Sequence, residues 1–255
     1  MNKFVKPLFA ALTAFSISAM VGTQAFAEEN VNEKILDKYR GPLTELVFVL
    51  DKSGSMFGLE EDTIGGFNSL IKKQKEESGK ARVTAVLFND KVKTLYDRVP
   101  LNKVEPITKK EYFVGGTTAL LDAVGETINR IKNNRLEQDN DKPVKTLFVI
   151  ITDGYENASK EYNYTKVKQL ITNQKEKEKW EFLFLGANID AAKEADRFGI
   201  ARNRAVRYKN DSKGVAKNYE VVSKIVASYS SGQSISDNWS AEIEKDYNNR
   251  EADKK

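Results

Sequence analysis

Between residues 43 and 230, the sequence alternates short apolar runs with longer stretches in which apolar residues recur every three or four positions. The short runs predict strands buried on both faces, and the longer stretches predict amphipathic helices. Strands are expected at about 43–51, 82–89, 92–99, 145–152, 180–186 and 205–208. Helices are expected at about 60–77, 118–134, 162–178, 189–198 and 212–229.

The alternation of strands with helices predicts an α/β fold of three layers, doubly wound and Rossmann-like, with a mostly parallel sheet. One connection is too short for a crossover helix, because only Asn89-Asp90-Lys91 separates two of the strands. These two strands are expected to be antiparallel, with the strand at about 92–99 on an edge of the sheet. Gly65-Gly66 weakens the prediction of the first helix, and residues 100–114 have no regular pattern.

The first 27 residues have the three parts of a secretory signal peptide. Lys3 and Lys6 precede an apolar stretch from Pro7 to Val21. Ala25-Phe26-Ala27 then provides small residues for cleavage, which is expected after Ala27. An uncleaved membrane anchor is the alternative, but the stretch is short for a membrane span and is interrupted by hydroxyl side chains. The protein is therefore expected to be secreted or associated with the cell surface.

The remaining sequence divides into a linker, one domain and a tail. Residues 28–42 are polar and are expected to form the linker, and residues 43–230 are expected to form the domain. Residues 231–255 are a polar tail that is expected to be flexible or loosely docked. Its few anchoring side chains are Ile235, Trp239, Ile243 and Tyr247. No second long apolar stretch follows the signal peptide, so no membrane span is expected in the mature chain.

The chain contains no cysteine and no histidine. An exported protein without cysteine has no disulfides, so its stability must come from its core and from any bound metal. The absence also excludes Ser-His-Asp and Cys-His catalytic groups and the thiolate and imidazole ligands of Zn²⁺. The formal charge of +4 is spread along the sequence, so nothing supports nucleic-acid binding. Few ordinary enzymes remain, and the protein is not expected to be one.

The first buried strand runs directly into Asp51-Lys52-Ser53-Gly54-Ser55. Asp51 is expected at the carboxyl end of this strand, with Ser53 and Ser55 on the loop beyond it. In open α/β sheets, ligands bind in the crevice outside the carboxyl ends of the strands. One carboxylate and two hydroxyls at that place form a cluster of oxygen atoms, which hard cations such as Mg²⁺ favour.

Two later segments present further oxygen atoms. Gly115-Gly116-Thr117 is a glycine-rich loop that carries a hydroxyl and precedes the helix at about 118–134. The buried strand at about 145–152 ends in Thr152-Asp153-Gly154, which is a second carboxylate followed by a turn. Thr117 and Asp153 are therefore expected to join the cluster that Asp51 begins.

Taken in order, Asp-x-Ser-x-Ser, Gly-Gly-Thr and a strand ending in Thr-Asp-Gly resemble the von Willebrand factor A domain, whose motif is the metal-ion-dependent adhesion site. The resemblance implies that Ser53 and Ser55 bind Mg²⁺ or Mn²⁺ directly. It implies that Thr117 binds directly or through water, and that Asp51 and Asp153 hold the coordinating hydroxyls and water molecules. Because the direct ligands are neutral, the ion is expected to attract an acidic side chain of a partner protein.

Each of these residues also has an ordinary structural interpretation. Asp51 and Ser53 could form an Asx turn, and Thr117 could cap a helix. Their occurrence together and in order favours the metal site. Asp122 could lie behind the metal ligands, but a solvated acid is favoured in the first turn of a helix. The N-terminus of that helix, near Ala119, is expected to face the crevice and to favour an anion.

The predicted function is that of a secreted, metal-dependent protein-binding module of the adhesion type. The sequence leaves the partner, the number of subunits and the physiological metal open. One alternative is an accessory subunit of a larger metal-dependent or ATP-driven assembly, although export argues against an ATP-linked partner. A metal-dependent hydrolase is a further alternative. Phosphotransferases of the haloacid dehalogenase type have a second Asp two residues after the first, where this chain has Ser53.

Overall fold

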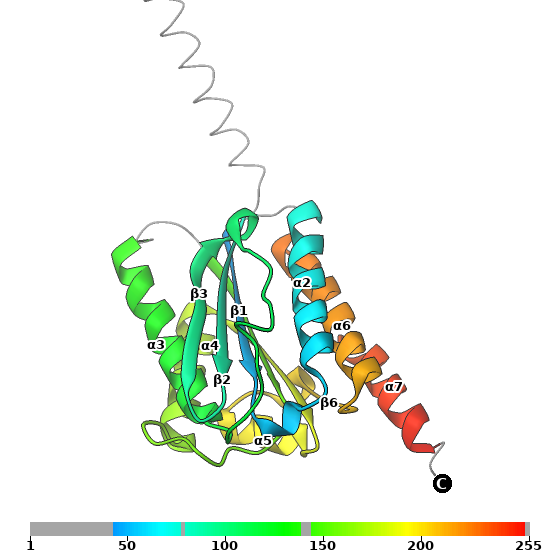
Figure 1. Ribbon diagram of the computed structural model, residues 1–255. Coiled ribbons are helices and arrows are strands. Elements are labelled where there is room, and N and C mark those ends of the chain that lie inside the picture. Colours follow the sequence, from blue (N-terminus) through cyan, green and yellow to red (C-terminus); the bar gives the residue numbers. More distant parts are fainter. Residues whose placement is uncertain (1–42, 78–79, 139–143, 253–255) are drawn as a thin grey trace, which may run out of the picture. The chain divides into compact units, whose positions relative to one another are not determined.

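A six-stranded sheet forms the centre of the fold, in the strand order β3-β2-β1-β4-β5-β6 (Figure 1). The computed structural model describes residues 43–77, 80–138 and 144–252. The strands are β1 (Leu43–Asp51), β2 (Ala81–Phe88), β3 (Val92–Pro100), β4 (Val144–Thr152), β5 (Glu181–Ala187) and β6 (Ala205–Tyr208). All neighbouring strands are parallel except β2 and β3, which are antiparallel. This arrangement confirms the predicted mostly parallel sheet with one antiparallel edge strand.

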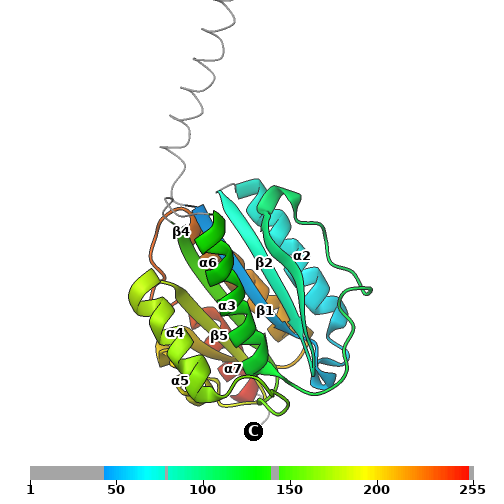
Figure 2. The ribbon, with the colours of Figure 1, turned by 90° about the vertical axis from the view of Figure 1, so that its left-hand side faces the viewer.

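Helices cover both faces of the sheet, so the predicted three layers are present (Figures 1 and 2). The helices α2, α6 and α7 lie on one face, and α3, α4 and α5 lie on the other. Their bounds are α2 (Glu60–Glu77), α3 (Leu120–Gln138), α4 (Tyr164–Glu178), α5 (Ala191–Phe198), α6 (Ser212–Ser230) and α7 (Ala241–Ala252). Short 3₁₀ turns occur at η1 (Gly54–Met56), η2 (Leu101–Lys103) and η3 (Arg202–Arg204).

Successive residues of β1 belong to two different hydrophobic cores, one on each face of the sheet. Leu46, Phe48 and Leu50 pack with the side chains of α2 and α6. Val47 and Val49 pack with the side chains of α3 and α4. Because side chains alternate between the faces of a strand, only a continuous apolar run can fill both cores. The apolar run that predicts this strand therefore also accounts for its central position.

The two helices α2 and α6 approach each other closely at Gly66. A Cβ atom at position 66 would lie 2.2 Å from Cδ2 of Tyr219, a buried residue of α6. Glycine is therefore required at this point of α2 for steric reasons, and the helix continues through it without a break. The Gly65-Gly66 pair weakens the helix prediction from sequence, but tertiary packing outweighs the low helix propensity of glycine.

We expect Gly66→Ala and Gly65→Ala to change stability in opposite directions. Gly66→Ala should destabilise the fold by about 1–3 kcal/mol, because the new methyl group overlaps the Tyr219 ring. At Gly65 a Cβ would meet nothing within 4 Å, so Gly65→Ala should stabilise the helix by about 0.5–1 kcal/mol. Urea unfolding followed by circular dichroism measures both. Equal effects at the two positions would contradict the described contact between α2 and α6.

The C-terminal segment differs from its prediction, because residues 241–252 form the helix α7. Ile235, Trp239 and Ile243 are buried in the same core as α6, and the indole nitrogen of Trp239 donates a hydrogen bond to the carbonyl oxygen of Asn203 at 2.7 Å. The helix α7 also contacts β6. No helix was expected in this tail, so α7 is an addition to the predicted elements. Ile243 is the buried residue of α7, and Ile235 and Trp239 anchor the segment that leads into it.

The predicted signal peptide and linker, residues 1–42, lie outside the described residues. Within the described residues, no helix has the length and apolar character that crossing a membrane requires. Residues 100–114, which have no regular pattern in the sequence, contain the short turn η2.

Candidate metal centre

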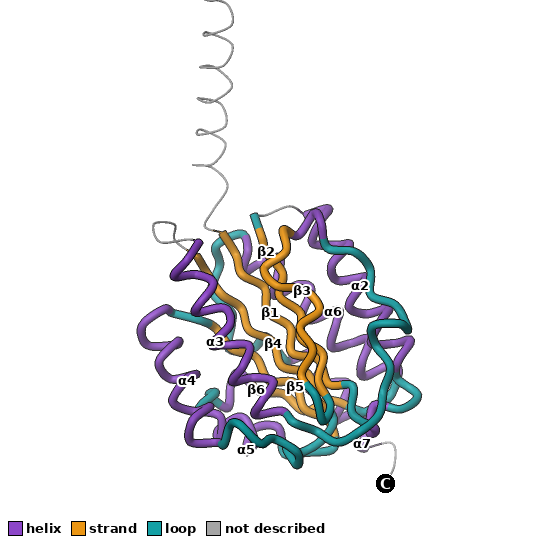
Figure 3. The backbone as a smooth tube through the Cα atoms, turned by 60° about the vertical axis from the view of Figure 1, so that its left-hand side comes forward, coloured by secondary structure: helices purple, strands orange, loops and turns teal. Residues whose placement is uncertain are grey.

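Two buried carboxylates meet where the neighbouring strands β1 and β4 end. The two strands are parallel, with Leu50 opposite Ile151, so their carboxyl ends lie at the same edge of the sheet. Asp51 is the last residue of β1, and Asp153 directly follows the last residue of β4. Both residues are only 1% exposed. The loops that follow the strands gather at this edge (Figure 3).

The Asp51 carboxylate organises the loop that carries the two serines. One of its oxygens accepts a hydrogen bond from the backbone nitrogen of Ser53 at 2.7 Å. The other accepts one from the hydroxyl of Thr152 at 2.7 Å. The hydroxyl of Tyr112 donates to the carbonyl oxygen of Asp51 at 2.6 Å. Asp51 therefore does form the Asx-type turn that is its ordinary interpretation, and it also joins the ends of β1 and β4.

Ser53, Ser55 and Asp153 form a connected row of oxygen atoms. The hydroxyl oxygens of Ser53 and Ser55 lie 3.1 Å apart. The Ser55 hydroxyl donates to one oxygen of Asp153 at 2.5 Å. The side-chain nitrogen of Asn210, on the loop between β6 and α6, donates to the other oxygen of Asp153 at 3.0 Å. The structure thus brings four of the five predicted residues together, and it adds Asn210, which no motif indicated.

The electrostatics of this cluster favour a cation. Burial raises the pKa of Asp51 to about 6, and the neighbouring Asp153 charge acts in the same direction. Burial likewise raises the pKa of Asp153. The groups that lower the two pKa values are hydrogen-bond donors, namely Thr152 and Ser53 for Asp51, and Ser55 and Asn210 for Asp153. The hydrogen bonds described for the two carboxylates thus come from neutral groups, and a bound cation would offset the negative charge that burial disfavours.

The predicted residue Thr117 and its neighbour Thr118 have different positions. Thr117 is exposed, and in the described part of the chain no hydrogen bond links its side chain to the other four predicted residues. Thr118 is 3% exposed. A Cβ atom placed on Gly154 would lie 3.7 Å from the Ser55 hydroxyl oxygen and 3.8 Å from that of Thr118. The hydroxyls of Ser55 and Thr118 therefore border the same space.

The glycine-rich loop is attached to the serine loop by backbone hydrogen bonds. The nitrogen of Gly54 donates to the oxygen of Gly116 at 3.0 Å, and the nitrogen of Gly115 donates to the oxygen of Lys52 at 2.9 Å. Gly116 has a φ angle of +78°, and a Cβ there would lie 2.2 Å from a carboxylate oxygen of Asp90. Both the backbone conformation and the available space therefore require glycine at position 116.

The backbone nitrogens at the N-terminus of α3 donate hydrogen bonds to the loop between β4 and α4. A carboxylate oxygen of Glu156 accepts the hydrogen bond of the Leu121 nitrogen at 2.8 Å. The hydroxyl oxygen of Ser159 accepts that of the Asp122 nitrogen at 2.9 Å. The side chain of Asn157 accepts that of the Thr118 nitrogen at 2.8 Å. The expectation that this helix end favours an external anion is therefore wrong, because an internal carboxylate occupies that position.

Asp122 is buried, in contrast to the solvated acid that its position suggested. Its two carboxylate oxygens accept hydrogen bonds from three consecutive backbone nitrogens, those of Lys160, Glu161 and Tyr162, at 2.8, 3.0 and 2.8 Å. These residues belong to the loop that follows Asp153. Asp122 therefore fixes the path of the β4–α4 loop, and it has no hydrogen bond to the metal centre.

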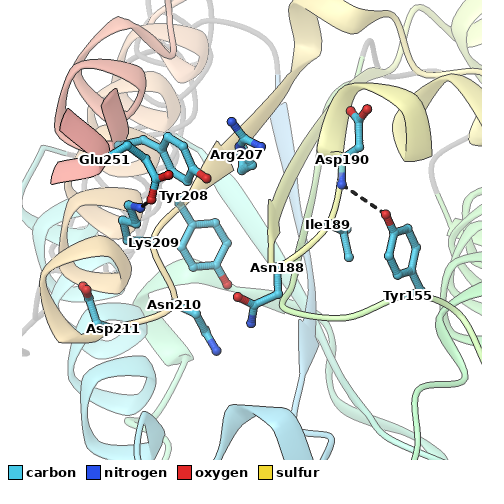
Figure 4. A pocket seen from close by; sticks show the side chains of 11 residues that line it. Tyr155, Asn188, Ile189, Asp190, Arg207, Tyr208, Lys209, Asn210, Asp211 and Glu251 are labelled. Carbon is cyan, nitrogen blue, oxygen red and sulfur yellow. Dashed lines mark hydrogen bonds and ion pairs between the residues drawn. The ribbon is translucent and has the colours of Figure 1, made fainter. Parts of the chain in front are cut away.

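A polar cavity of about 420 Å³ lies beside the cluster, at the carboxyl ends of β5 and β6 (Figure 4). Tyr155, Tyr208 and Asn210 are among the residues that line it, and the hydroxyl of Tyr155 accepts a hydrogen bond from the nitrogen of Asp190 at 3.3 Å. Lys209 forms an ion pair with Glu251 of α7. The charges of this cavity are thus largely paired within the protein.

The donor set suits a hard divalent cation and excludes several other metals. Hydroxyl and carboxylate oxygens are the ligands that Mg²⁺ and Mn²⁺ prefer. Among the described residues, no group of three or more acidic side chains could hold a metal ion by itself. A site at this edge therefore depends on combining two carboxylates with neutral hydroxyls, which is the combination that the motifs predict.

Comparison with known proteins gives one family and several structures of the same fold. The family model described as von Willebrand factor type A domain matches residues 45–221. No curated protein matches the chain.

Among solved structures, the PilB minor pilin from Streptococcus sanguinis is 13% identical over 73% of this chain and 61% of that protein, with a TM-score of 0.52. The von Willebrand factor type A protein from Catenulispora acidiphila is 14% identical over 76% of this chain and 44% of that one, with a TM-score of 0.51. Proximal thread matrix protein 1 from the mussel byssus is 16% identical over 73% and 47%, with a TM-score of 0.50. The chain thus spans about half to three fifths of these proteins, and the likeness concerns the fold.

Proposed function

We propose, from the premise that the chain belongs to the von Willebrand factor type A domain family, that it binds a divalent cation and, through this cation, an acidic side chain of a protein partner. Domains of this family commonly mediate adhesion between proteins. The observation that carries the proposal is the cluster at the ends of β1 and β4. It combines two buried carboxylates with serine and threonine hydroxyls, and the described hydrogen bonds to these carboxylates come from neutral donors.

In this proposal the residues of the cluster have distinct tasks. The hydroxyls of Ser53, Ser55 and Thr118 are the direct protein ligands of Mg²⁺ or Mn²⁺. Asp51 accepts the hydrogen bond of the Ser53 backbone nitrogen, Asp153 accepts that of the Ser55 hydroxyl, and both carboxylates supply negative charge behind the ligands. When bound, the ion supplies a positive charge that the neutral ligands leave available for an acidic oxygen of the partner. Thr118 takes the role that the resemblance assigned to Thr117, because its hydroxyl borders the space beside Ser55.

The two adjacent threonines allow a matched test of this assignment. We expect Thr118→Val to weaken Mg²⁺ binding by about tenfold or more, because it replaces a hydroxyl ligand by a methyl group of similar size. Thr117→Val should leave the affinity nearly unchanged, because the Thr117 side chain is exposed and lies outside the cluster. Isothermal titration calorimetry measures both affinities. A loss with Thr117→Val and none with Thr118→Val would restore the assignment made from the sequence.

The partner-binding step can be tested without knowledge of the natural partner. A display library of short random peptides is selected on the immobilised protein in Mg²⁺, in Mn²⁺ and in EDTA. The expected result is enrichment of peptides that contain Asp or Glu, only when a divalent cation is present. Equal enrichment in EDTA, or enrichment without an acidic residue, would refute the proposed function.

Catalysis is not part of the proposal. The chain has no histidine and no cysteine, so it can form neither a Ser-His-Asp nor a Cys-His catalytic group. We also propose that the protein acts outside the cell or on its surface. This part is supported by the signal-peptide pattern of residues 1–27, and two of the similar structures are named as a minor pilin and a byssus thread matrix protein.

A further inference from the structure

We infer that the partner segment bound at the metal centre carries, beside its acidic residue, a large apolar side chain that packs between Phe57 and Phe113 and a basic side chain that faces the N-terminus of α2. The inference rests on the proposed function, because it places these contacts next to the cation-bound acid. It adds a specificity that the oxygen cluster alone does not provide.

Exposed aromatic side chains are concentrated around the metal centre. Among the described residues, the exposed large hydrophobic side chains are Phe57 at 82%, Phe113 at 59% and Tyr155 at 50%. Phe57 lies two positions after Ser55, and Tyr155 lies two positions after Asp153. Single exposed apolar residues are ordinary on protein surfaces, but a group around one site is typical of an interaction surface. Aromatic side chains are also enriched among the residues that dominate binding energy.

A groove beside the loop that carries Ser53 and Ser55 is lined by both phenylalanines. It has a volume of about 740 Å³ and is lined by Phe57, Glu60, Asp62, Tyr112, Phe113 and Val114, among others. The groove lies close to the site, because its lining residue Tyr112 is buried and donates a hydrogen bond from its hydroxyl to the carbonyl oxygen of Asp51. The Lys52 ammonium lies 4.4 Å from the centre of the Phe113 ring and supports it from the protein side. The groove can therefore receive a side chain of a segment whose acidic residue reaches the cation.

The acidic residues that border the groove favour a basic side chain close to the apolar side chain of the partner. Three consecutive acids, Glu60, Glu61 and Asp62, form the first turn of α2 and border the groove. Lys109 pairs with Glu61 at 2.5 Å, so the acids outnumber the basic groups that line the groove. Acids at a helix N-terminus stabilise the helix, but they also give this rim a negative potential. A basic side chain of the partner is therefore complementary to the α2 side of the groove.

The same charge favours a protein segment over a membrane surface. Exposed aromatic residues can also insert into the interface of a bilayer, and such sites usually carry lysine and arginine beside them. Here the groove is bordered by acids, which anionic lipids repel. A peptide with an acidic, an apolar and a basic side chain can contact all three features: the acid binds the cation, the apolar side chain packs on the phenylalanines, and the base faces the acids of α2.

The peptide library tests this inference separately from the proposed function. In Mg²⁺, the intact protein should enrich peptides that combine an acidic residue with a nearby aromatic or large aliphatic residue and a Lys or Arg. The double variant Phe57→Ser/Phe113→Ser should still enrich the acid but lose the apolar preference. Peptides selected on the intact protein should bind this variant about tenfold more weakly or worse. Lys177→Ala, an exposed position of α4, serves as the matched control and should bind them unchanged.

The outcomes are distinguishable. Enrichment of acidic peptides with no apolar preference, or undiminished binding to the double variant, would overturn the inference and leave the proposed function standing. Loss of both the acid preference and the cation dependence would instead refute the proposed function. Vesicles of phosphatidylcholine and phosphatidylglycerol provide the lipid arm. Sedimentation of the intact protein with them, but not of the double variant, would overturn the inference in favour of a membrane surface. Circular dichroism confirms that each variant is folded.

Discussion

Asp51→Asn is expected to weaken Mg²⁺ binding by about 10–100-fold while leaving the fold intact. The substitution removes one of the two buried charges behind the serine hydroxyls, and loss of such supporting groups typically has an effect of this size. The asparagine oxygen can still accept the hydrogen bond of the Ser53 nitrogen. Burial raises the pKa of Asp51 to about 6. Ionisation of Asp51 at neutral pH therefore destabilises the folded protein when no cation is bound. In EDTA, the variant should therefore be as stable as the intact protein, or more stable by about 1–2 kcal/mol.

Two measurements check this prediction. Calorimetric titration gives the Mg²⁺ affinity, and thermal unfolding with Mg²⁺ and with EDTA gives the stabilisation that the cation provides. Asp190→Asn is the matched control, since Asp190 is an exposed acid at the same edge and asparagine can replace it as the N-cap of α5. Equal Mg²⁺ affinities for the intact protein and Asp51→Asn would rule out the metal centre described here.

Asp122→Ala is expected to destabilise the protein by about 2–4 kcal/mol. The carboxylate is buried and accepts three backbone hydrogen bonds, and alanine would leave the nitrogens of residues 160–162 without these partners. The corresponding decrease in melting temperature is about 5–15 °C for a domain of this size. Urea unfolding followed by circular dichroism measures the change in free energy.

The control for this variant lies on the same helix. Glu126 is an exposed acid one turn further along α3, and Glu126→Ala should change stability by no more than about 0.5 kcal/mol. If Asp122→Ala had an equally small effect, Asp122 would be the solvated acid that the sequence suggested, and the described course of the 160–162 loop would be wrong.

The strands and helices were predictable from sequence because their signals are local. The run that forms β1 is apolar at five successive positions, and burial on both faces of a parallel strand demands that pattern. The helix predicted at 60–77 agrees with α2, since its apolar residues recur at the helical period. The same locality explains the site: Asp51 ends a recognisable strand, Ser53 and Ser55 lie on the loop after it, and Asp153 directly follows another strand.

What the sequence could not provide are contacts that depend on the course of loops. The bonds of Asp122 and Glu156 join residues 35 to 40 positions apart, and no spacing rule relates them. Which of the two adjacent threonines faces the site depends on where the chain turns into α3. That turn is set by the hydrogen bond between the Ala119 nitrogen and the Asn89 oxygen. The mostly polar composition of α7 likewise gave no signal for a helix, because its buried residue Ile243 reaches a core formed by distant residues.

The position of α7 against β6 bears on how molecules of this protein can associate. An uncovered outer strand offers free backbone groups to a strand of another molecule, which is a common route to fibrous aggregates. Here one outer strand, β6, has only four residues and lies against α7. The other, β3, is irregular in its pairing with β2 and ends in Pro100. Addition of a strand from another molecule is therefore disfavoured at both edges of the sheet. In the proposed function, contacts with other proteins are made instead by side chains at the loop end of the sheet.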